Sequence, residues 1–596
     1  MTDIWPGEIV ARIAKEEGAT HLFGILGGHI EWVIDNAYMQ GLEVVQVRHE
    51  QAAVFAADAF ARINRRPGVC FATAGPGMLN MATGVHLSYL CRTPLVCLFG
   101  GSRESEAYRG SMQEAYAEKV LGSITKWTHR ITDPRTTAYF VRKAFKDAMT
   151  PPYGPVALEF PVDLFNFEPT SMSKQVAYVD TPWASVAQSL AVADQASVDR
   201  AAKLIAQAKR PMIIGGDGLY WSRSSEALQR LVAHTPIPFN LRRMARGLMP
   251  ENHDLGVVSP ARPNIIKEAD LVVLAGLNVG YLEGFGAWRT DARFLQIGET
   301  MDDIYPALPT ELAMVGDCGA ILDQITAQLP PSSDRADWLK TVDENKAKYA
   351  GKVEQEIQQA NQAVPLKPRL ISDAVTRVAN DDAIYIADSF TLSAFFLEQL
   401  QALAPGQVLD TGASATFGNG VGMAIGAQMA APNRQVIVLI GDGGMGLGGG
   451  DIEVAVRYEL PIVFVVYNNS MLGSGLEDYA YGEGFPVLGP KANRGFHLTQ
   501  DVRYDEMYAA LGCHGEHVTE PAELEPALKR ALASGKTAVV NIISSANVRH
   551  RLLDSDNARE MFWHLPVDQV QPDARARHHD YLYRKFHNGK TLVMDD

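Results

Sequence analysis

A chain of 596 residues exceeds what one hydrophobic core can organise, so about three domains are expected. Its net charge of −15 argues against a nucleic-acid partner, because nucleic-acid binders need a basic surface. With no bilayer-long apolar run, no leader-like start and five scattered cysteines, the chain is expected to be cytoplasmic with no membrane partner.

Residues 1–167 alternate short apolar strands with amphipathic helices, which predicts a doubly wound parallel sheet. The strand candidates are residues 21–25, 44–47, 68–72, 95–98 and 156–160. Glu50 stands where the second strand gives way to a helix, and Ala74-Gly75-Pro76 forms a tight loop after the third strand. Glycine in such a loop permits a close backbone approach to a ligand.

A second domain is predicted at 195–330, after a linker rich in Ser, Thr and Pro. It opens with a helix at 197–208. Its strand candidates are residues 211–214, 271–274 and 293–297. A charged helical connector then leads to the third domain.

The third domain, 369–546, contains the most informative stretch of the chain. An apolar strand at 435–440 runs into Gly441-Asp442-Gly443-Gly444 and then a helix at 451–457. A second buried strand, 461–467, is followed by Asn469, and a strand at 538–542 closes the domain. Free backbone N–H groups and the positive helix end make such a turn a seat for a diphosphate.

Asp442 and Asn469 supply oxygen ligands of the kind that Mg²⁺ prefers when it bridges protein and phosphates. A plain strand–turn–helix connection is the alternative reading. The last segment, 547–596, has no αβ rhythm and is rich in basic and aromatic residues. It is either disordered or packed over another part of the molecule.

The Gly441–Gly444 turn with Asn469 resembles the diphosphate-binding signature of thiamine-diphosphate enzymes, and Arg48-His49-Glu50 resembles their activating-glutamate motif. The resemblance covers nearly all of 1–546. It implies an α/β fold of three doubly wound parallel-sheet domains (pyrimidine-binding, central and diphosphate-binding) plus a C-terminal tail. It also implies thiamine diphosphate and Mg²⁺ as cofactors, and a homodimer or homotetramer with active sites at the subunit interface.

The resemblance assigns roles residue by residue. Glu50 would hydrogen-bond the pyrimidine ring nitrogen and favour the tautomer that activates the cofactor, although a plain helix N-terminal charge is the alternative. Phe417 would be the bulky wedge that bends the cofactor, or else ordinary core packing. The other cofactor-binding residues expected are Gly27, Gly28, Ala74, Gly75, Pro76, Ser389, Phe390, Gly441, Gly443, Gly444 and Leu472, and the expected metal ligands are Asp442, Asn469 and Met471.

The segments around His29, Gln113 and 125–130 look most like benzaldehyde lyase and the 2-hydroxyacyl-CoA lyases. In benzaldehyde lyase, the residues that match His29 and Gln113 face the reacting carbons. The expected catalytic residues are therefore Glu50, His29 and Gln113. A neutral imidazole can take a hydroxyl proton and an amide can orient oxygens, whereas a structural histidine is the alternative.

Segments 244–253 and 259–264 resemble oxalyl-CoA decarboxylase and 2-hydroxyacyl-CoA lyase, so Arg246 and Arg262 are expected to contact coenzyme A. The match is incomplete, because Pro263 follows Arg262 where those enzymes have serine. The strand end at 275–278 also lacks the arginine of the FAD-binding acetolactate synthases, which argues against FAD. The tail is expected to act as a lid over the substrate, with interface packing as the alternative.

The sequence thus predicts a carbon–carbon lyase that reversibly cleaves a 2-hydroxyacyl-CoA to formyl-CoA and a ketone or aldehyde. The specific candidate substrate is 2-hydroxyisobutyryl-CoA. The alternatives, in order, are a benzaldehyde-lyase-like carboligase, an oxalyl-CoA or 2-oxo acid decarboxylase, and an acetolactate-synthase-like enzyme. A non-catalytic scaffold would lack Glu50, Asp442 or Asn469, and all three are present.

Overall fold

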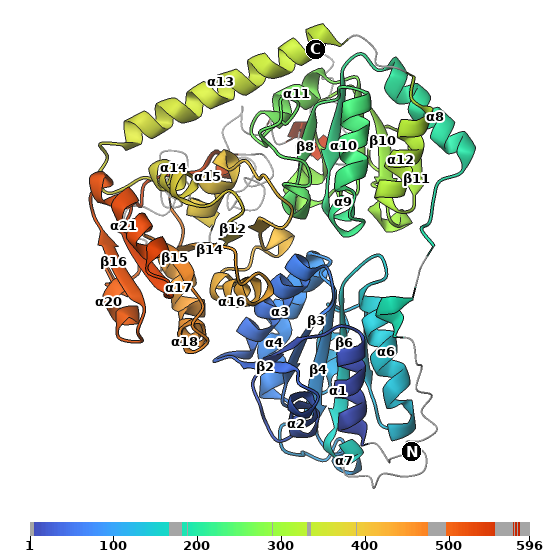
Figure 1. Cartoon of the computed structure of the whole chain (residues 1–596), viewed down its shortest axis with the longest axis vertical. Coiled ribbons are helices and arrows are strands. Elements are labelled where there is room, and N and C mark those ends of the chain that lie inside the picture. The colour runs from blue at the N-terminus through green and yellow to red at the C-terminus, as the bar shows by residue number, and fades with distance from the viewer. Residues whose placement is uncertain are drawn as a thin grey trace.

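The computed structural model describes residues 5–165, 182–186, 189–288, 290–330, 335–388, 390–474, 496–554, 576, 579–580 and 582–583. Figure 1 shows three lobes, each built around one parallel β-sheet with helices on both faces. The expected α/β fold with three doubly wound parallel-sheet domains is therefore confirmed. No helix in the described ranges has both the length and the apolar character needed to cross a bilayer.

The first domain has a six-stranded sheet in the order β2-β1-β3-β4-β6-β5. Its strands are β1 (His21–Gly24), β2 (Glu43–Gln46), β3 (Gly68–Ala72), β4 (Leu95–Gly101), β5 (Trp127–Arg130) and β6 (Pro155–Pro161). Its helices are α1 (Pro6–Glu16), α2 (Glu31–Met39), α3 (Glu50–Asn64), α4 (Pro76–Leu90), α5 (Ala117–Leu121), α6 (Thr137–Ala148) and α7 (Val162–Phe165).

The central domain has a five-stranded sheet in the order β11-β10-β9-β7-β8. Its strands are β7 (Pro211–Gly215), β8 (Phe239–Leu241), β9 (Leu271–Ala275), β10 (Arg293–Gly298) and β11 (Thr310–Val315). Its helices are α8 (Gln195–Gln207), α9 (Asp217–Trp221), α10 (Ser225–His234), α11 (Arg262–Glu268) and α12 (Cys318–Gln328). The predicted connector is the long helix α13 (Ala336–Ala360), which runs from this lobe to the third one in Figure 1.

The third domain has a six-stranded sheet in the order β13-β12-β14-β15-β17-β16. Its strands are β12 (Ile384–Ala387), β13 (Val408–Leu409), β14 (Val436–Gly441), β15 (Ile462–Asn468), β16 (His514–Val518) and β17 (Ala538–Ile543). Its helices are α14 (Pro368–Val378), α15 (Phe390–Gln399), α16 (Gly420–Ala430), α17 (Asp442–Gly448), α18 (Ile452–Arg457), α20 (Tyr504–Ala509) and α21 (Pro521–Ala533).

All the strands predicted from the sequence are present, and their ends differ by at most a few residues. The strands that were not predicted are β5, β8, β11, β12, β13 and β16. Five of these, β5, β8, β11, β13 and β16, are edge strands, which are often short or carry polar side chains. Such strands lack the continuous apolar run that marks a strand buried on both faces.

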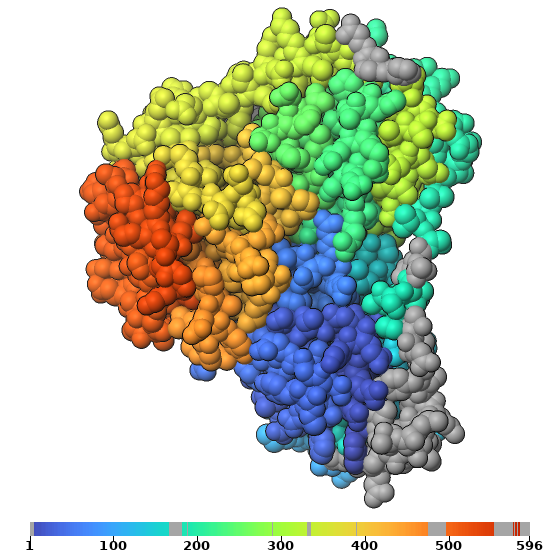
Figure 2. All heavy atoms as spheres, in the orientation of Figure 1, coloured from blue at the N-terminus to red at the C-terminus, as the bar shows by residue number. Residues whose placement is uncertain are grey.

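Helices α3 and α16 join the first domain to the third along a close contact. A Cβ added to Gly422 would lie 2.8 Å from the Ala52 carbonyl oxygen, and one on Gly426 would lie 1.9 Å from that of Ala56. Only glycine permits this approach, and the matching positions show that the two helices run in the same direction. The space-filling view in Figure 2 shows the third domain packed directly against both other domains.

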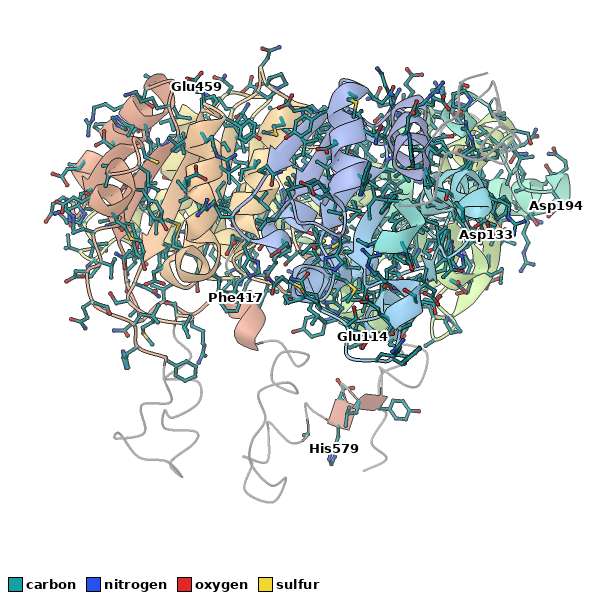
Figure 3. All side chains as sticks on the ribbon, turned by 90° about the horizontal axis from the view of Figure 1, so that it is seen from below. Glu114, Asp133, Asp194, Phe417, Glu459 and His579 are labelled. Carbon is teal, nitrogen blue, oxygen red and sulfur yellow. The ribbon has the colours of Figure 1, made fainter. Side chains whose placement is uncertain are left out.

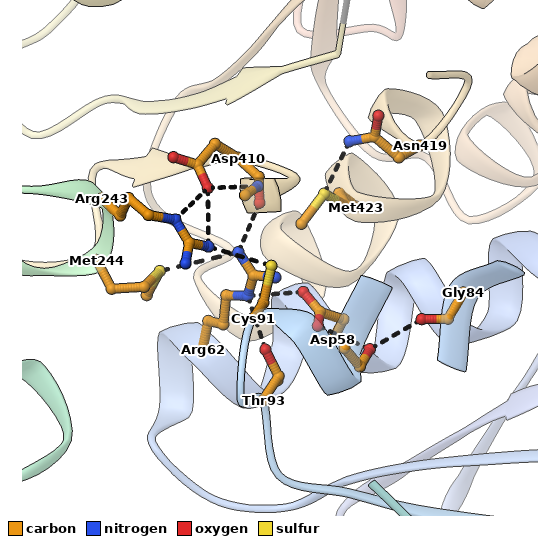
Figure 4. A network of polar contacts seen from close by, with 12 residues as sticks. Asp58, Arg62, Gly84, Cys91, Thr93, Arg243, Met244, Asp410, Asn419 and Met423 are labelled. Atoms are coloured by element: carbon orange, nitrogen blue, oxygen red, sulfur yellow. Dashed lines mark hydrogen bonds and ion pairs between the residues drawn. The ribbon is translucent and has the colours of Figure 1, made fainter. Parts of the chain in front are cut away.

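A buried network of charges marks the place where all three domains meet (Figure 4). Arg62 of α3 has no exposed side-chain surface, pairs with Asp58 at 2.7 Å and donates to the Asp410 carbonyl at 2.8 Å. Arg243 of the central domain pairs with Asp217 at 2.8 Å and with the Asp410 carboxylate at 3.0 Å. Asp410 of the third domain therefore binds arginines of the two other domains.

Arg62→Met tests whether this junction holds the domains together. The substitution leaves the fully buried Asp58 carboxylate without its cation, which costs about 3–5 kcal/mol of unfolding free energy. Guanidinium denaturation followed by tryptophan fluorescence measures this loss. Arg200→Met is the control, because Arg200 pairs with Glu311 at 3.6 Å on the surface and contributes less than about 0.5 kcal/mol. Equal effects of the two substitutions would contradict the interpretation.

Candidate active site

The predicted diphosphate turn is formed where β14 ends and α17 begins. Gly441 precedes the helix and Asp442 is its first residue, buried with 3% of its surface exposed. The Oδ1 atom of Asp442 accepts the Gly443 N–H at 2.8 Å, whereas its buried Oδ2 atom has no hydrogen-bond partner among the described residues. Burial raises the pKa of Asp442 to about 6, against the opposing effect of nearby backbone N–H groups.

Asn469 reaches the same place from the neighbouring strand. Strands β14 and β15 are paired so that Gly441 lies beside Tyr467, which brings the residues after both strands together. The Asn469 side chain accepts the Met471 N–H and donates to the Gly473 carbonyl, each at 3.3 Å. These two contacts curl the chain into a short loop beside Asp442.

Leu472 continues that loop over the diphosphate turn. A Cβ added to Gly443 would lie 2.7 Å from the Leu472 Cδ2 atom, so the two predicted cofactor contacts are adjacent. The Leu472 N–H donates to the Phe496 carbonyl at 2.7 Å, and Met471 pairs with His497. The segment after residue 495 thus supports the loop from outside.

The oxygen atoms of Asp442 and Asn469 suit a Mg²⁺ ion that is shared with phosphate groups better than a metal ion that is held by protein side chains alone. Nowhere in the described ranges do three or more His, Cys, Asp or Glu side chains gather in a way that could hold a metal. A free buried oxygen on Asp442 beside the Asn469 loop instead suits a cation that takes one carboxylate and completes its shell with phosphate oxygens. Asp442, Asn469 and Met471 would hold it.

Glu50 begins helix α3 and lies buried against helix α4. Its Oε2 atom accepts the Asn80 side-chain N–H at 2.9 Å, and a Cβ on Gly77 would come within 3.2 Å of Oε1. Asn80 was not predicted, although it is an amide one turn after the Gly75-Pro76-Gly77 loop. It orients the carboxyl group whose other oxygen lies against that loop.

Thr73, which was also not predicted, lies beside His29, and Gln113 packs against Gly75 two residues further along the chain. The His29 Nδ1 atom lies 3.3 Å from the Thr73 hydroxyl, and a Cβ on Gly27 would lie 2.6 Å from the Thr73 Cβ. Gly75 has a φ of 55°, and a Cβ there would lie 2.6 Å from the Gln113 carbonyl oxygen. Burial lowers the pKa of His29, so its imidazole is neutral at neutral pH.

The two predicted aromatic residues are exposed in the single chain. Phe417 and Phe390 keep 45% and 49% of their surface accessible, which is uncommon for side chains of this size. Phe417 and Glu114, a neighbour of Gln113, lie on the same face of the molecule in Figure 3, opposite to Glu459. Ala74 is buried, Pro76 and Gly28 are exposed, and Ser389 lies outside the described residues.

Asp451, which was not predicted, ties the third domain to the loop that presents Glu50. It ends the 3₁₀ helix Gly449–Asp451 and its Oδ1 atom accepts the Arg48 N–H at 2.7 Å. Burial raises the pKa of Asp451 to about 6, although the N–H groups of Arg48 and His49 favour the charged form. A lone aspartate after three glycines carries no sequence signal for this contact.

The two arginines expected to contact coenzyme A belong to different networks. Arg246 is buried, pairs with Glu251 at 2.6 Å and donates to the Leu397 and Leu400 carbonyls. Arg262 pairs with Glu283, and burial lowers the pKa of Arg262 to about 10 despite that partner. The buried Nε atom of Arg262 has no hydrogen-bond partner among the described residues, so it keeps a free donor.

The start of the C-terminal segment is anchored to helix α15. His550 is buried, lies 3.1 Å from Glu398 and stands edge-on to Phe390 and Phe395. Burial acts to raise the pKa of Glu398, but His550 and the charges of Arg551 and Arg369 lower it to about 2. The predicted lid falls almost entirely on residues outside the described ranges.

Comparison with known families gives the same three-part division. The model of the N-terminal thiamine pyrophosphate binding domain matches residues 5–120, that of the central domain matches 198–325, and that of the C-terminal binding domain matches 391–542. The chain belongs to the thiamine pyrophosphate enzymes. Thiamine diphosphate and its usual partner Mg²⁺ are therefore its cofactors, as the buried free oxygen of Asp442 also indicates.

Relatives of this thiamine pyrophosphate enzyme have several activities. A Mycobacterium bovis protein described as a probable acetolactate synthase is 29% identical over 91% of this chain and 96% of its own length. The 2-hydroxyacyl-CoA lyase of Arabidopsis thaliana is 26% identical, and the oxalyl-CoA decarboxylase of Escherichia coli strain K12 is 25% identical, each over 90% of this chain and 94% of its own length. The family is shared, whereas the reactions differ.

Asp442→Asn tests the metal site. Replacing the free carboxylate oxygen by a neutral amide removes a charged ligand, so the affinity for thiamine diphosphate in excess Mg²⁺ is expected to fall about 100-fold. Isothermal titration of the cofactor-free protein measures it. Asp373→Asn is the control, because Asp373 lies on α14 and pairs with Arg377 at 2.9 Å. Unchanged affinity in the Asp442 variant would contradict the assignment.

Asp451→Asn tests the buried carboxylate that contacts the Glu50 loop. The pKa of Asp451 is raised from 3.8 to about 6 in the folded chain. Below pH ~4 the carboxyl group is therefore protonated in both the folded and the unfolded chain, and it does not change the free energy of unfolding. As the pH rises from ~4 to ~6 only the unfolded state ionises, and the native protein loses about 1.4 kcal/mol per pKa unit of difference. Relative to the variant, the native chain should lose unfolding free energy across this window. A pH-independent difference would reject the argument.

Proposed function

We propose that this thiamine pyrophosphate enzyme is a 2-hydroxyacyl-CoA lyase. It cleaves the bond between the carbinol carbon and the thioester carbon, giving formyl-CoA and a ketone or aldehyde, and it runs in both directions. The candidate substrate is 2-hydroxyisobutyryl-CoA, which gives acetone. The observation that carries the proposal is that His29 contacts Thr73 and Gln113 contacts Gly75 on one short loop, whose Gly77 lies against the buried Glu50.

The cofactor, when bound, supplies a nucleophilic carbon that adds to the thioester carbonyl and accepts the electron pair released by carbon–carbon cleavage. Cleavage requires that the 2-hydroxyl group lose its proton. His29 is suited to take this proton, because burial keeps its imidazole neutral and Thr73 holds Nδ1, leaving Nε2 for the substrate. The Gln113 amide orients the substrate oxygens.

Glu50 would hydrogen-bond the cofactor ring, and Asn80 orients its carboxyl group through the 2.9 Å hydrogen bond. Phe390 and Phe417, both exposed in the single chain, would give the assembled site an apolar wall that excludes water from the reacting carbons. Such a wall favours short branched or aromatic acyl groups over a charged oxalyl group.

The coenzyme A moiety is assigned to the side of the central domain. The buried Nε atom of Arg262 has no partner among the described residues, so Arg262 would need to turn outward to donate to a phosphate or adenine acceptor. The guanidinium of Arg246 is already bound to Glu251 and two carbonyls, so it supports the wall of the site through α15.

The active site is completed by a second copy of the chain, in a homodimer or homotetramer. Large apolar side chains close in the sequence to the predicted site residues are exposed in the single chain, which supports a subunit contact there. They are Leu26, Trp32, Leu79, Tyr108, Met112, Phe390, Phe417 and Leu447.

A second candidate is an acetolactate-synthase activity, favoured by the 29% identity to the Mycobacterium bovis protein. That reaction joins two molecules of pyruvate and needs no coenzyme A. Conversion of pyruvate to acetolactate therefore distinguishes an acetolactate synthase from a 2-hydroxyacyl-CoA lyase.

In the deciding experiment, the enzyme is first loaded with thiamine diphosphate and Mg²⁺. It is then incubated with formyl-CoA together with acetone or benzaldehyde. We expect a 2-hydroxyacyl-CoA product, detected by mass spectrometry. Parallel reactions contain benzaldehyde alone or pyruvate alone. Acetolactate or benzoin formed without any 2-hydroxyacyl-CoA would reject the proposal.

Glu50→Gln serves as the catalytic control in this assay. It keeps the shape of the side chain but cannot exchange a proton with the cofactor ring, so turnover is expected to fall at least about 100-fold. Asp373→Asn, distant from the site on α14, should retain activity. Native turnover in the Glu50 variant would contradict the assigned role.

A further inference from the structure

Asp388 is a buried carboxylate that the predicted site residues do not include. It follows strand β12, donates its N–H to the Leu439 carbonyl at 3.0 Å and has 6% of its surface exposed. No cation pairs with it in the described part of the chain. Burial raises the pKa of Asp388 to about 6, and a buried charge of this kind is costly unless its oxygens are satisfied.

Both carboxylate oxygens accept backbone N–H groups of the loop that carries Phe417. Oδ1 accepts the Gly418 N–H at 3.1 Å and Oδ2 accepts the Gly420 N–H at 2.6 Å. Gly420 is the first residue of α16, and Asn419, which precedes it, makes no side-chain cap. The aspartate therefore satisfies helix N-terminal N–H groups from another element of the sheet.

Glycines pack closely around this carboxylate and around the loop that it binds. A Cβ on Gly444 of the diphosphate turn would lie 2.4 Å from the Asp388 Oδ1 atom. On the other side of the loop, a Cβ on Gly448 would lie 2.4 Å from the Gly418 carbonyl oxygen. The end of β12, the Phe417 loop and helix α17 are thus in mutual contact through Asp388 and Gly418.

We propose that Asp388 is a positioning residue that holds the loop carrying Phe417 in place against helix α17. It acts through the Gly418 and Gly420 N–H groups and touches no reacting atom. The proposal rests on the cofactor site, including the wedge role of Phe417, and not on the coenzyme A substrate. A purely structural helix cap is the competing explanation, and it predicts a loss of stability without a specific effect on the bound cofactor.

The test uses Asp388→Asn, which places an N–H donor against a backbone N–H. The readout is the rate of hydrogen–deuterium exchange at the thiazolium C2 atom of bound thiamine diphosphate, measured by quenched-flow NMR without substrate. If Phe417 acts as the wedge, it would bend the bound cofactor and so promote exchange at this carbon. We expect exchange at least tenfold slower in the variant, with cofactor affinity within threefold of the native value.

Phe417→Ala and the double variant Asp388→Asn/Phe417→Ala complete the cycle. If Asp388 acts through Phe417, the double variant exchanges at the rate of Phe417→Ala alone, within twofold. Asp388→Ser, which keeps one hydroxyl acceptor, should give intermediate exchange and is measured in the same way should the asparagine variant not fold. Asp373→Asn is the control for a carboxamide elsewhere in the domain.

Three outcomes would overturn the proposal: unchanged exchange in the Asp388 variants, independent effects in the double variant, or a large loss of cofactor affinity with normal exchange per bound cofactor. The last would show that Asp388 supports the diphosphate turn at Gly444 instead. Because no substrate is present, a failed 2-hydroxyacyl-CoA assay leaves this result interpretable.

Discussion

The direct contact between helices α3 and α16 determines where the parts of the candidate active site lie. Gly422 and Gly426 let the two backbones touch, and the helices run in the same direction. The start of α3, which carries Glu50, therefore lies beside the start of α16, which follows Phe417. A side chain at either glycine would separate the first domain from the third and move these two residues apart.

Three buried carboxylates of the third domain form no salt bridge with any of the residues that the structure describes. Asp388 holds the Phe417 loop, Asp451 binds the Glu50 loop, and Asp442 keeps one oxygen free for a cation. Burial raises the pKa of each to about 6, so all three remain ionised at neutral pH at a cost in folding free energy. The backbone N–H groups that they accept reduce this cost, and the loops they hold are those around the cofactor.

The buried strands and the diphosphate turn were predictable because β14, β15 and their neighbours are uninterrupted apolar runs with a glycine turn between them. Edge strands such as β5 and β16 were not, because their residues are polar and half-buried. Asn80 and Thr73 escaped prediction because each contributes one side chain from a position with no distinguishing pattern. Asp388 and Asp451 escaped it because their partners are backbone groups distant in the sequence, which only the folded chain brings near.

The two neighbouring glycines before His29 differ in the room around them. Gly27 is confined, since a Cβ would lie 2.6 Å from the Thr73 Cβ, whereas a Cβ on Gly28 would meet nothing within 4 Å. The chain before His29 is therefore confined at one residue and open at the next. A single codon change at position 28 can add bulk beside the imidazole without a clash in the described chain, and under the proposed function it would narrow the range of acyl groups that the enzyme admits.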